Sequence, residues 1–169
     1  ILRIGDAGGG VTPKDIIEVA GQQTYKVSEP VQTGKWYHIA LTYDQPAGKS
    51  AIYVNGKKWA ETGWAIPGFD PNADVGFNIG MIPGFQWGTR PLYGYMSEVR
   101  VWSVARTETQ LKQNMLTVDP SSPGLELYFK LNGTDAQAGG YITDNSKNKI
   151  ECSTNISIFE TLDTPVKIE

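Results

Sequence analysis

The feature that most constrains the fold of this chain is a pair of short β-type runs joined by the dipeptide Asn55-Gly56. The runs cover residues 50–54 and 57–61, and a longer β-type run at residues 36–43 precedes them. Asn-Gly suits the centre of a type I′ turn, because both central residues of that turn need positive φ angles. The sequence therefore predicts a strand that leads into a β-hairpin at Asn55-Gly56.

A second pattern, further along the chain, predicts a strand that stops at a short helix. The β-type run at residues 93–102 is followed by Thr107 and, three positions later, by Gln110. Thr as N-cap with Gln at the third helical position forms a capping box, in which each side chain satisfies a backbone donor of the first turn. Leu111 and Met115 lie four residues apart and so share one helix face. We expect this helix over residues 107–115.

The rest of the chain also consists of short β-type runs separated by turn residues. Nineteen glycines and ten prolines divide these runs, and no internal repeat is present. Regular alternation of short strands and turns is typical of an all-β sandwich. The further predicted strands are residues 2–5, 16–20, 24–27, 76–80 and 125–131, and, with weaker patterns, 150–153, 156–159 and 166–168.

Composition excludes several classes of protein. The 169 residues are 40% hydrophobic and 20% charged, as in ordinary globular domains, and no apolar run approaches the roughly 20 residues of a membrane-spanning helix. The net charge of −3 comes without a basic cluster that could follow a phosphate backbone, so nucleic acid is not an expected partner. Cys152 is the only cysteine, which excludes an internal disulfide and a cysteine-based zinc site.

The strand and hairpin around Trp36 and Asn55-Gly56, together with the strand and capped turn at residues 94–111, resemble the laminin G-like, pentraxin-like members of the concanavalin A-like lectin and glucanase superfamily. The apolar strand at residues 124–132 and the Asp144-x-Ser146-x-Asn148 turn resemble a unit common in bacterial laminin G-like domains. The resemblance implies a concanavalin A-like jelly-roll β-sandwich with one short helix. Asp, Asn and Ser stabilise tight turns through their own backbone, which gives that turn a structural role.

The same resemblance implies one laminin G-like domain over residues 1–169 and an extracellular or cell-surface location, or a periplasmic one. The missing disulfide favours a bacterial source. The chain begins at Ile1 without a methionine or a leader, and few strands precede Trp36. We therefore expect it to be a fragment of a longer exported protein.

The sequence predicts no catalytic residue. Retaining glucanases of the superfamily carry two glutamates in a Glu-x-Asp-x-x-Glu run, because nucleophile and acid must lie about 5 Å apart across the glycosidic bond. No Glu-x-Asp occurs in this chain. Glu98, the best single acid, stands beside Arg100 and is interpreted as half of an ion pair. His38, the only histidine, lies within a predicted strand and is assigned to packing or to a hydrogen bond.

No metal or cofactor is predicted either. Pentraxins bind calcium through an acidic run after the strand that corresponds to residues 77–80, but this chain has Met81-Ile82-Pro83 there. Residues 70–74 alternate oxygen ligands, yet they lack the downstream Gly and Glu of an EF-hand loop. A turn-rich loop is the favoured interpretation of that segment, with an ion site as the alternative.

Surface aromatics remain as the candidate binding groups. Trp36 and Trp102 fall inside predicted strands and are expected in the core, whereas Trp59 could be buried or exposed. Trp64 and Trp87 lie in Gly/Pro-rich connections, where binding residues concentrate, although each could instead anchor its loop by burial. The candidate carbohydrate-binding residues are Trp64, Asp70, Asn72, Gln86, Trp87, Arg90 and Tyr93.

These residues suit a sugar, because indole and phenol rings stack on its C–H faces while planar polar side chains take its hydroxyl groups. The sequence therefore predicts a non-catalytic carbohydrate-binding module of an exported or cell-surface bacterial protein, with a polysaccharide or glycan as partner. The alternative is a structural or protein-binding laminin G-like domain without a sugar site.

Overall fold

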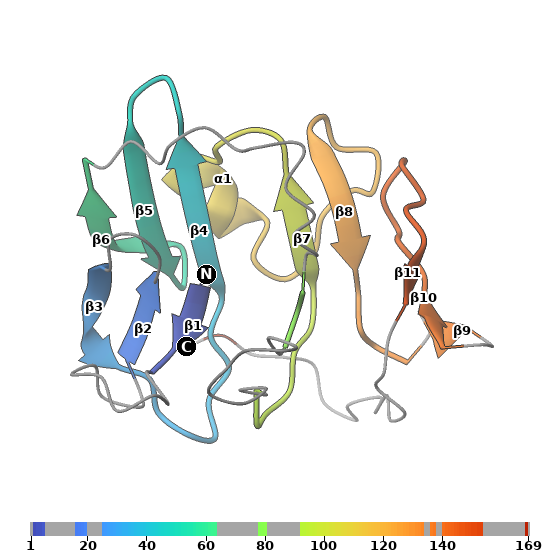
Figure 1. Cartoon of the computed structure of the whole chain (residues 1–169), viewed down its shortest axis with the longest axis horizontal. Helices are drawn as coiled ribbons and strands as arrows, with labels where there is room; N and C mark the ends of the chain where they lie inside the picture. Colours follow the sequence, from blue (N-terminus) through green and yellow to red (C-terminus); the bar gives the residue numbers. More distant parts are fainter. Residues whose placement is uncertain are drawn as a thin grey trace. The chain divides into compact units, whose positions relative to one another are not determined.

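A computed structural model describes residues 2–5, 16–19, 25–63, 78–80, 92–133, 136–137, 140–153 and 168. The chain divides into two compact units, Ile1–Gly94 and Tyr95–Glu169. Figure 1 shows the strands and the one helix of the described residues. In chain order they are β1 (Leu2–Ile4), β2 (Ile16–Val19), β3 (Tyr25–Pro30), β4 (Ile39–Asp44), β5 (Lys49–Val54), β6 (Lys57–Thr62), β7 (Val99–Trp102), α1 (Glu108–Gln113), β8 (Leu125–Phe129), β9 (Ala136–Gln137), β10 (Tyr141–Ile142) and β11 (Cys152–Ser153).

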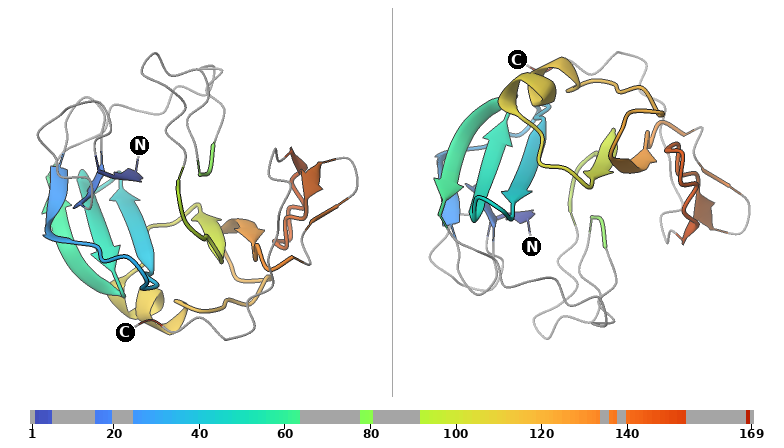
Figure 2. Two further views of the ribbon diagram at one scale, coloured as in Figure 1. Left: turned by 90° about the horizontal axis from the view of Figure 1, so that it is seen from below. Right: turned by 90° about the horizontal axis from the view of Figure 1, so that it is seen from above.

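The first unit contains two antiparallel three-stranded sheets, ordered β1-β2-β3 and β4-β5-β6 (Figure 2). One apolar cluster joins them, with Ile16, Ile17 and Val19 from β2 and Ile52 and Val54 from β5. The partly buried rings of Tyr37 and Trp59 pack against this cluster, which gives Trp59 a role in packing. Burial of branched side chains from both sheets is the main force that stabilises this unit.

The predicted hairpin at Asn55-Gly56 is confirmed. Asn55 has a φ of 50° and Gly56 a φ of 71°, and Val54 pairs with Lys57 across the turn. The Asn55 side-chain oxygen accepts the backbone N–H of His38 at 3.0 Å, and the Asn55 N–H donates to the His38 carbonyl at 2.8 Å. The hairpin is therefore tied to the start of β4 through the backbone of His38.

The sequence predicted that this strand begins at Trp36. The tie to the hairpin explains why β4 begins at Ile39 instead. Ile39 pairs with Val54, the last residue of β5, so His38 lies opposite a turn residue rather than a strand residue. Trp36 is half-buried and forms only an isolated bridge.

The second unit is built on the antiparallel pair β7-β8 and on a small sheet ordered β11-β10-β9. Its core contains Val118, Leu125 and Tyr128, against which Trp102 packs, as expected for that tryptophan. The predicted capping box is present: Thr107 accepts the Gln110 N–H at 3.3 Å, and Gln110 accepts the Thr107 N–H at 3.0 Å. The helix ends at Gln113 and buries Leu111.

Three further predicted strands are shorter than expected. β7 begins at Val99, not at Tyr93, because Glu98 has a positive φ of 58° that breaks the extended backbone. β8 ends at Phe129, two residues before Leu131, whose φ of 54° departs from extended backbone. β11 covers only Cys152–Ser153.

Other predicted strands differ from the observed ones, or fall on residues outside those that the structure describes. Residues 78–80 form a bend rather than the end of a strand, and β9 and β10 were not predicted. Residues 76–77 and 156–159 lie outside the described residues, as do 166–167, while Ile168 forms an isolated bridge. Among the described residues, no helix has both the length and the apolar character needed to cross a membrane.

Candidate functional site

Of the seven predicted sugar-binding residues, the structure describes Tyr93. Tyr93 is 93% exposed. The Leu92 N–H donates to the Gly80 carbonyl at 2.7 Å, so the backbone next to Tyr93 is fixed to residues 78–80. An anchored backbone with a fully presented phenol ring offers a flat stacking surface to a ligand.

The six other candidates lie outside the described residues: Trp64, Asp70, Asn72, Gln86, Trp87 and Arg90. The possible ion site at residues 70–74 lies there too. Within the described part of the chain, no cluster of His, Cys, Asp and Glu could hold a metal ion. The candidate sugar surface thus stays a prediction, of which Tyr93 is the part with a described geometry.

Glu98 forms the ion pair that the sequence suggested. Its carboxylate accepts a hydrogen bond from the Arg100 guanidinium and another, at 2.7 Å, from the Tyr128 hydroxyl. Arg100 also donates to the Asn114 carbonyl and lies 5.3 Å from the centroid of the Tyr128 ring. Burial raises the pKa of Tyr128, and the hydrogen bond to Glu98 raises this pKa further. The Glu98 carboxylate is thus committed to holding two side chains in place.

The Asp144-Ser146-Asn148 turn has the structural role expected of it. The buried Asp144 carboxylate accepts backbone N–H groups of Tyr128 and Ile150 at 2.9 Å and of Ser146 at 2.8 Å. Burial alone would raise the pKa of Asp144, but these hydrogen bonds and one from the Ser146 hydroxyl outweigh it and lower the pKa. The turn is thereby fastened to β8.

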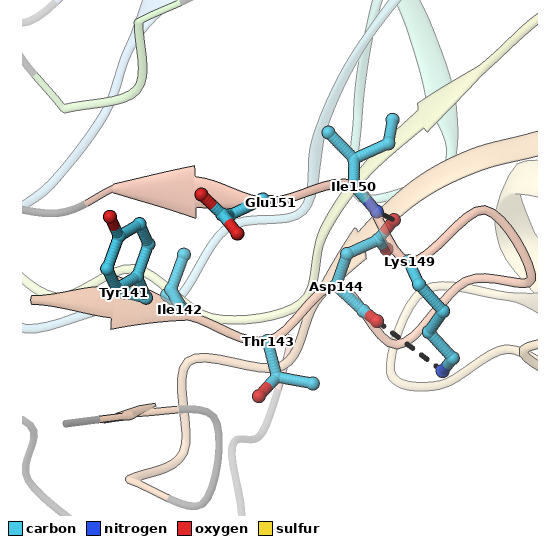
Figure 3. A pocket seen from close by; sticks show the side chains of 7 residues that line it. All are labelled: Tyr141, Ile142, Thr143, Asp144, Lys149, Ile150 and Glu151. Carbon is cyan, nitrogen blue, oxygen red and sulfur yellow. Dashed lines mark hydrogen bonds between the residues drawn. The ribbon is translucent and has the colours of Figure 1, made fainter. Parts of the chain in front are cut away.

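A pocket that the sequence did not suggest lies in the second unit, next to this turn (Figure 3). It has a volume of about 240 Å³ and is formed by residues 141–144 and 149–151. Tyr141 is 40% exposed and Ile150 44% exposed, while Asp144 forms part of the wall. The sequence signal that could have found it is a tyrosine after Gly139-Gly140, with Lys149 and Glu151 a few residues beyond the turn.

Comparison with known proteins identifies the family. A laminin G sequence model, described as the concanavalin A-like lectin/glucanases superfamily, matches residues 6–112. The chain belongs to this superfamily. Membership confirms the predicted fold class, an all-β jelly-roll sandwich of the concanavalin A-like type. No curated protein is significantly similar to the chain.

Two solved structures resemble this superfamily member. One is the crystal structure of a candidate carbohydrate binding protein from Bacteroides ovatus. Its sequence is 63% identical to this chain over 100% of the chain, and the TM-score is 0.91. The chain spans 48% of that protein, about half its length. An S-layer domain-containing protein from Clostridium thermocellum is 19% identical over 58% of this chain and 49% of its own, with a TM-score of 0.43, which is too low to support an inference.

Proposed function

We propose that this domain is a non-catalytic carbohydrate-binding module of an exported bacterial protein, and that its sugar surface includes Tyr93. The observation that carries the proposal is the 93% exposure of Tyr93 on a backbone held by the Leu92–Gly80 hydrogen bond. The similarity to the Bacteroides ovatus protein, described as a candidate carbohydrate binding protein, supports the same ligand class. An exported or cell-surface location is part of the proposal and follows from the resemblance to laminin G-like domains.

The proposed surface combines rings and planar polar groups in one stretch of sequence. Trp87 lies six residues before Tyr93, with Gln86 and Arg90 close by, and Trp64 is in the other Gly/Pro-rich connection. The rings would stack on the C–H faces of successive sugar units. The amide and guanidinium groups would take hydroxyl groups in pairs, which supplies specificity.

Absence of catalysis is also part of this proposal. Cleavage by the known retaining mechanism needs two carboxyl groups about 5 Å apart, one as nucleophile and one as acid. The chain lacks the Glu-x-Asp-x-x-Glu run, and Glu98 is engaged by Arg100 and Tyr128. We therefore expect glycans that bind to be recovered uncleaved, with no release of reducing ends. Release that scales with protein concentration and disappears in Glu98→Gln would refute this part.

The test of binding is a glycan array followed by affinity gels at high protein concentration. Tyr93→Ala and Trp87→Ala should each weaken binding about five- to tenfold, because one stacked ring contributes on the order of 1 kcal/mol. Arg90→Ala should weaken the same ligand. Leu116→Ala is the control, because it removes another exposed apolar side chain, 53% exposed, from a different part of the sequence.

The outcome also separates this function from the alternative. If no glycan is retained, or if Tyr93→Ala binds as well as the unchanged protein, the proposed sugar surface is wrong. If Trp87→Ala unfolds the domain, Trp87 stabilises its loop by packing and does not serve as a sugar-binding ring. A structural or protein-binding role then replaces carbohydrate binding.

A further inference from the structure

The pocket beside the Asp144 turn has a fixed backbone. Residues 141–142 belong to β10, which pairs with β11 through Tyr141–Ser153 and Ile142–Cys152. The buried Asp144 carboxylate accepts the Ile150 N–H at 2.9 Å, which joins the two segments that form the pocket. Lys149 has a φ of 53°, which turns the chain back towards β10. A site held in this way loses little conformational entropy when a ligand binds.

The side chains around this pocket combine a ring, apolar groups and both signs of charge. Figure 3 shows Tyr141, Ile142 and Glu151 along one part of the pocket, and Asp144, Lys149 and Ile150 along the other. The Lys149 ammonium contacts the Asp144 carbonyl at 3.5 Å, the outer limit of a hydrogen bond. A ligand oxygen can replace so long a contact at small cost.

These groups fit a neutral, hydroxyl-rich ligand better than an ion. The Asp144 carboxylate in the wall is already engaged by four hydrogen bonds within the protein. The Lys149 ammonium would attract an anion, but the Glu151 carboxylate, along the other part of the pocket, would repel it, and the reverse holds for a cation. A neutral polyol can use both, since hydroxyl groups donate to carboxylates and accept from ammonium groups. The partly exposed Tyr141 ring offers a face to C–H groups.

The volume of the pocket suits one small ring. Its volume of about 240 Å³ lies below the roughly 300–1,000 Å³ of sites for drug-sized ligands. One monosaccharide unit therefore suits it better than an extended oligosaccharide.

We propose that the pocket formed by Tyr141, Lys149 and Glu151 is a second sugar-binding site, which takes one neutral monosaccharide unit of a glycan. This inference rests on the proposed carbohydrate-binding function for its ligand class, but it concerns residues separate from Tyr93 and its loop. Two sites on one module would raise the apparent affinity for a polysaccharide through multivalency, even where each site is weak.

The experiment is a nuclear magnetic resonance titration of the labelled chain with methyl glycosides of glucose, galactose, mannose and xylose at high millimolar concentration. At least one glycoside should cause saturable shifts of amides in residues 141–153. Those shifts should persist in the double variant Trp87→Ala/Tyr93→Ala, which removes the rings of the other proposed surface.

Variants of the pocket test the assigned contacts. Lys149→Asn removes the ammonium with a residue that tolerates positive φ, and Glu151→Gln removes the charge while it keeps the shape. Each should weaken binding at residues 141–153 about three- to tenfold. Tyr141→Ala should weaken it about two- to tenfold. Lys147→Asn is the matched control, because the exposed Lys147 is outside the pocket lining, and it should bind within about twofold of the unchanged protein.

The outcomes distinguish this site from the proposed function itself. If glycosides shift only amides near Tyr93, the second site is refuted while the proposed function stands. If shifts at residues 141–153 vanish in the double variant, or are unaffected by Lys149→Asn and Glu151→Gln, the pocket is not an independent sugar site. If no glycoside shifts any amide and no array glycan is retained, both proposals fail.

Discussion

Glu98, the acidic residue that the sequence offered as the best single candidate for catalysis, holds two other side chains of the fold in place. It pairs with Arg100 and accepts the Tyr128 hydroxyl, and the Arg100 side chain is only 6% exposed. Removing one partner of a buried pair leaves the other charge without compensation, which costs more than the pair itself contributes.

We therefore expect Glu98→Ala to lower the free energy of unfolding by about 2–3 kcal/mol, which urea denaturation would measure. This value is below the usual range for a buried pair, because the Glu98 side chain is 25% exposed and solvent screens part of the interaction. Glu61→Ala is the control: Glu61 pairs with Lys58 and Lys49 at the surface, so stability should change little. Equal losses in both variants would refute a special role for Glu98.

Asp144 gives the stability of the fold a defined pH dependence. Its pKa is lowered in the folded chain, so its ionised form is stabilised by folding. That contribution is complete above the ordinary aspartate pKa of about 3.9, and it is lost as the pH falls through the lowered pKa of the folded state.

Asp144→Asn should therefore be less stable by about 1–3 kcal/mol at neutral pH, because its amide nitrogen cannot accept the N–H groups that the carboxylate accepts. The stability difference between Asp144→Asn and the unchanged protein should shrink as the pH falls below about 4, because Asp144 then becomes protonated in the unfolded chain while it is still ionised in the folded one. Urea denaturation at neutral and acidic pH would measure both effects. A difference that stays constant with pH would show that the charge of Asp144 does not matter.

At the scale of elements, the Asn55-Gly56 hairpin shows how a local backbone requirement places a strand. Both residues have positive φ, and the turn also holds the start of β4 through His38. Gly56→Val should lower the free energy of unfolding by about 1 kcal/mol or more, because a β-branched residue is strained at positive φ. Gly63→Val is the control, since Gly63 does not have positive φ and a Cβ there would meet nothing within 4 Å. An unchanged thermal midpoint for Gly56→Val would contradict this account.

The sequence predicts the start and end of an element where neighbouring residues determine them, and fails where residues distant in the sequence do. The hairpin and the capping box of α1 were predictable, because their own turn and cap residues determine the backbone angles and hydrogen bonds there. The start of β7 was not, because the positive φ of Glu98 goes with a hydrogen-bonded cluster that includes Tyr128, thirty residues away. The two-residue strands β9 and β10 are too short to show a hydrophobic period.

The same distinction applies to the candidate sites. Tyr93 was selected as a candidate because an aromatic residue beside a Gly/Pro-rich connection is a local signal, and its part in sugar binding stays a prediction. The pocket at Tyr141 and Lys149 arises from the pairing of β10 with β11 and from the hydrogen bond between Asp144 and Ile150. The local signals, a tyrosine after Gly139-Gly140 and the charges of Lys149 and Glu151, name the residues but do not predict those contacts between separate segments.

At the scale of the whole molecule, the two compact units Ile1–Gly94 and Tyr95–Glu169 can unfold together or separately. The match to the superfamily covers residues 6–112 and so crosses the boundary between the two units. The similarity to the Bacteroides ovatus structure covers all of the chain. The single domain expected from the sequence stays a proposal, and small single domains usually unfold in one cooperative transition.

Native-state hydrogen exchange tests this prediction directly, because amides that exchange only by global unfolding all report the same free energy. The slowest amides of β5 in the first unit and of β8 in the second should therefore report one value. Gly56→Val, in the first unit, should lower the protection of β8 by as much as that of β5. Asp144→Asn, in the second unit, should lower the protection of β5 by as much as that of β8. If each variant instead weakens only the strand of its own unit, the two units unfold independently and the chain is not one cooperative domain.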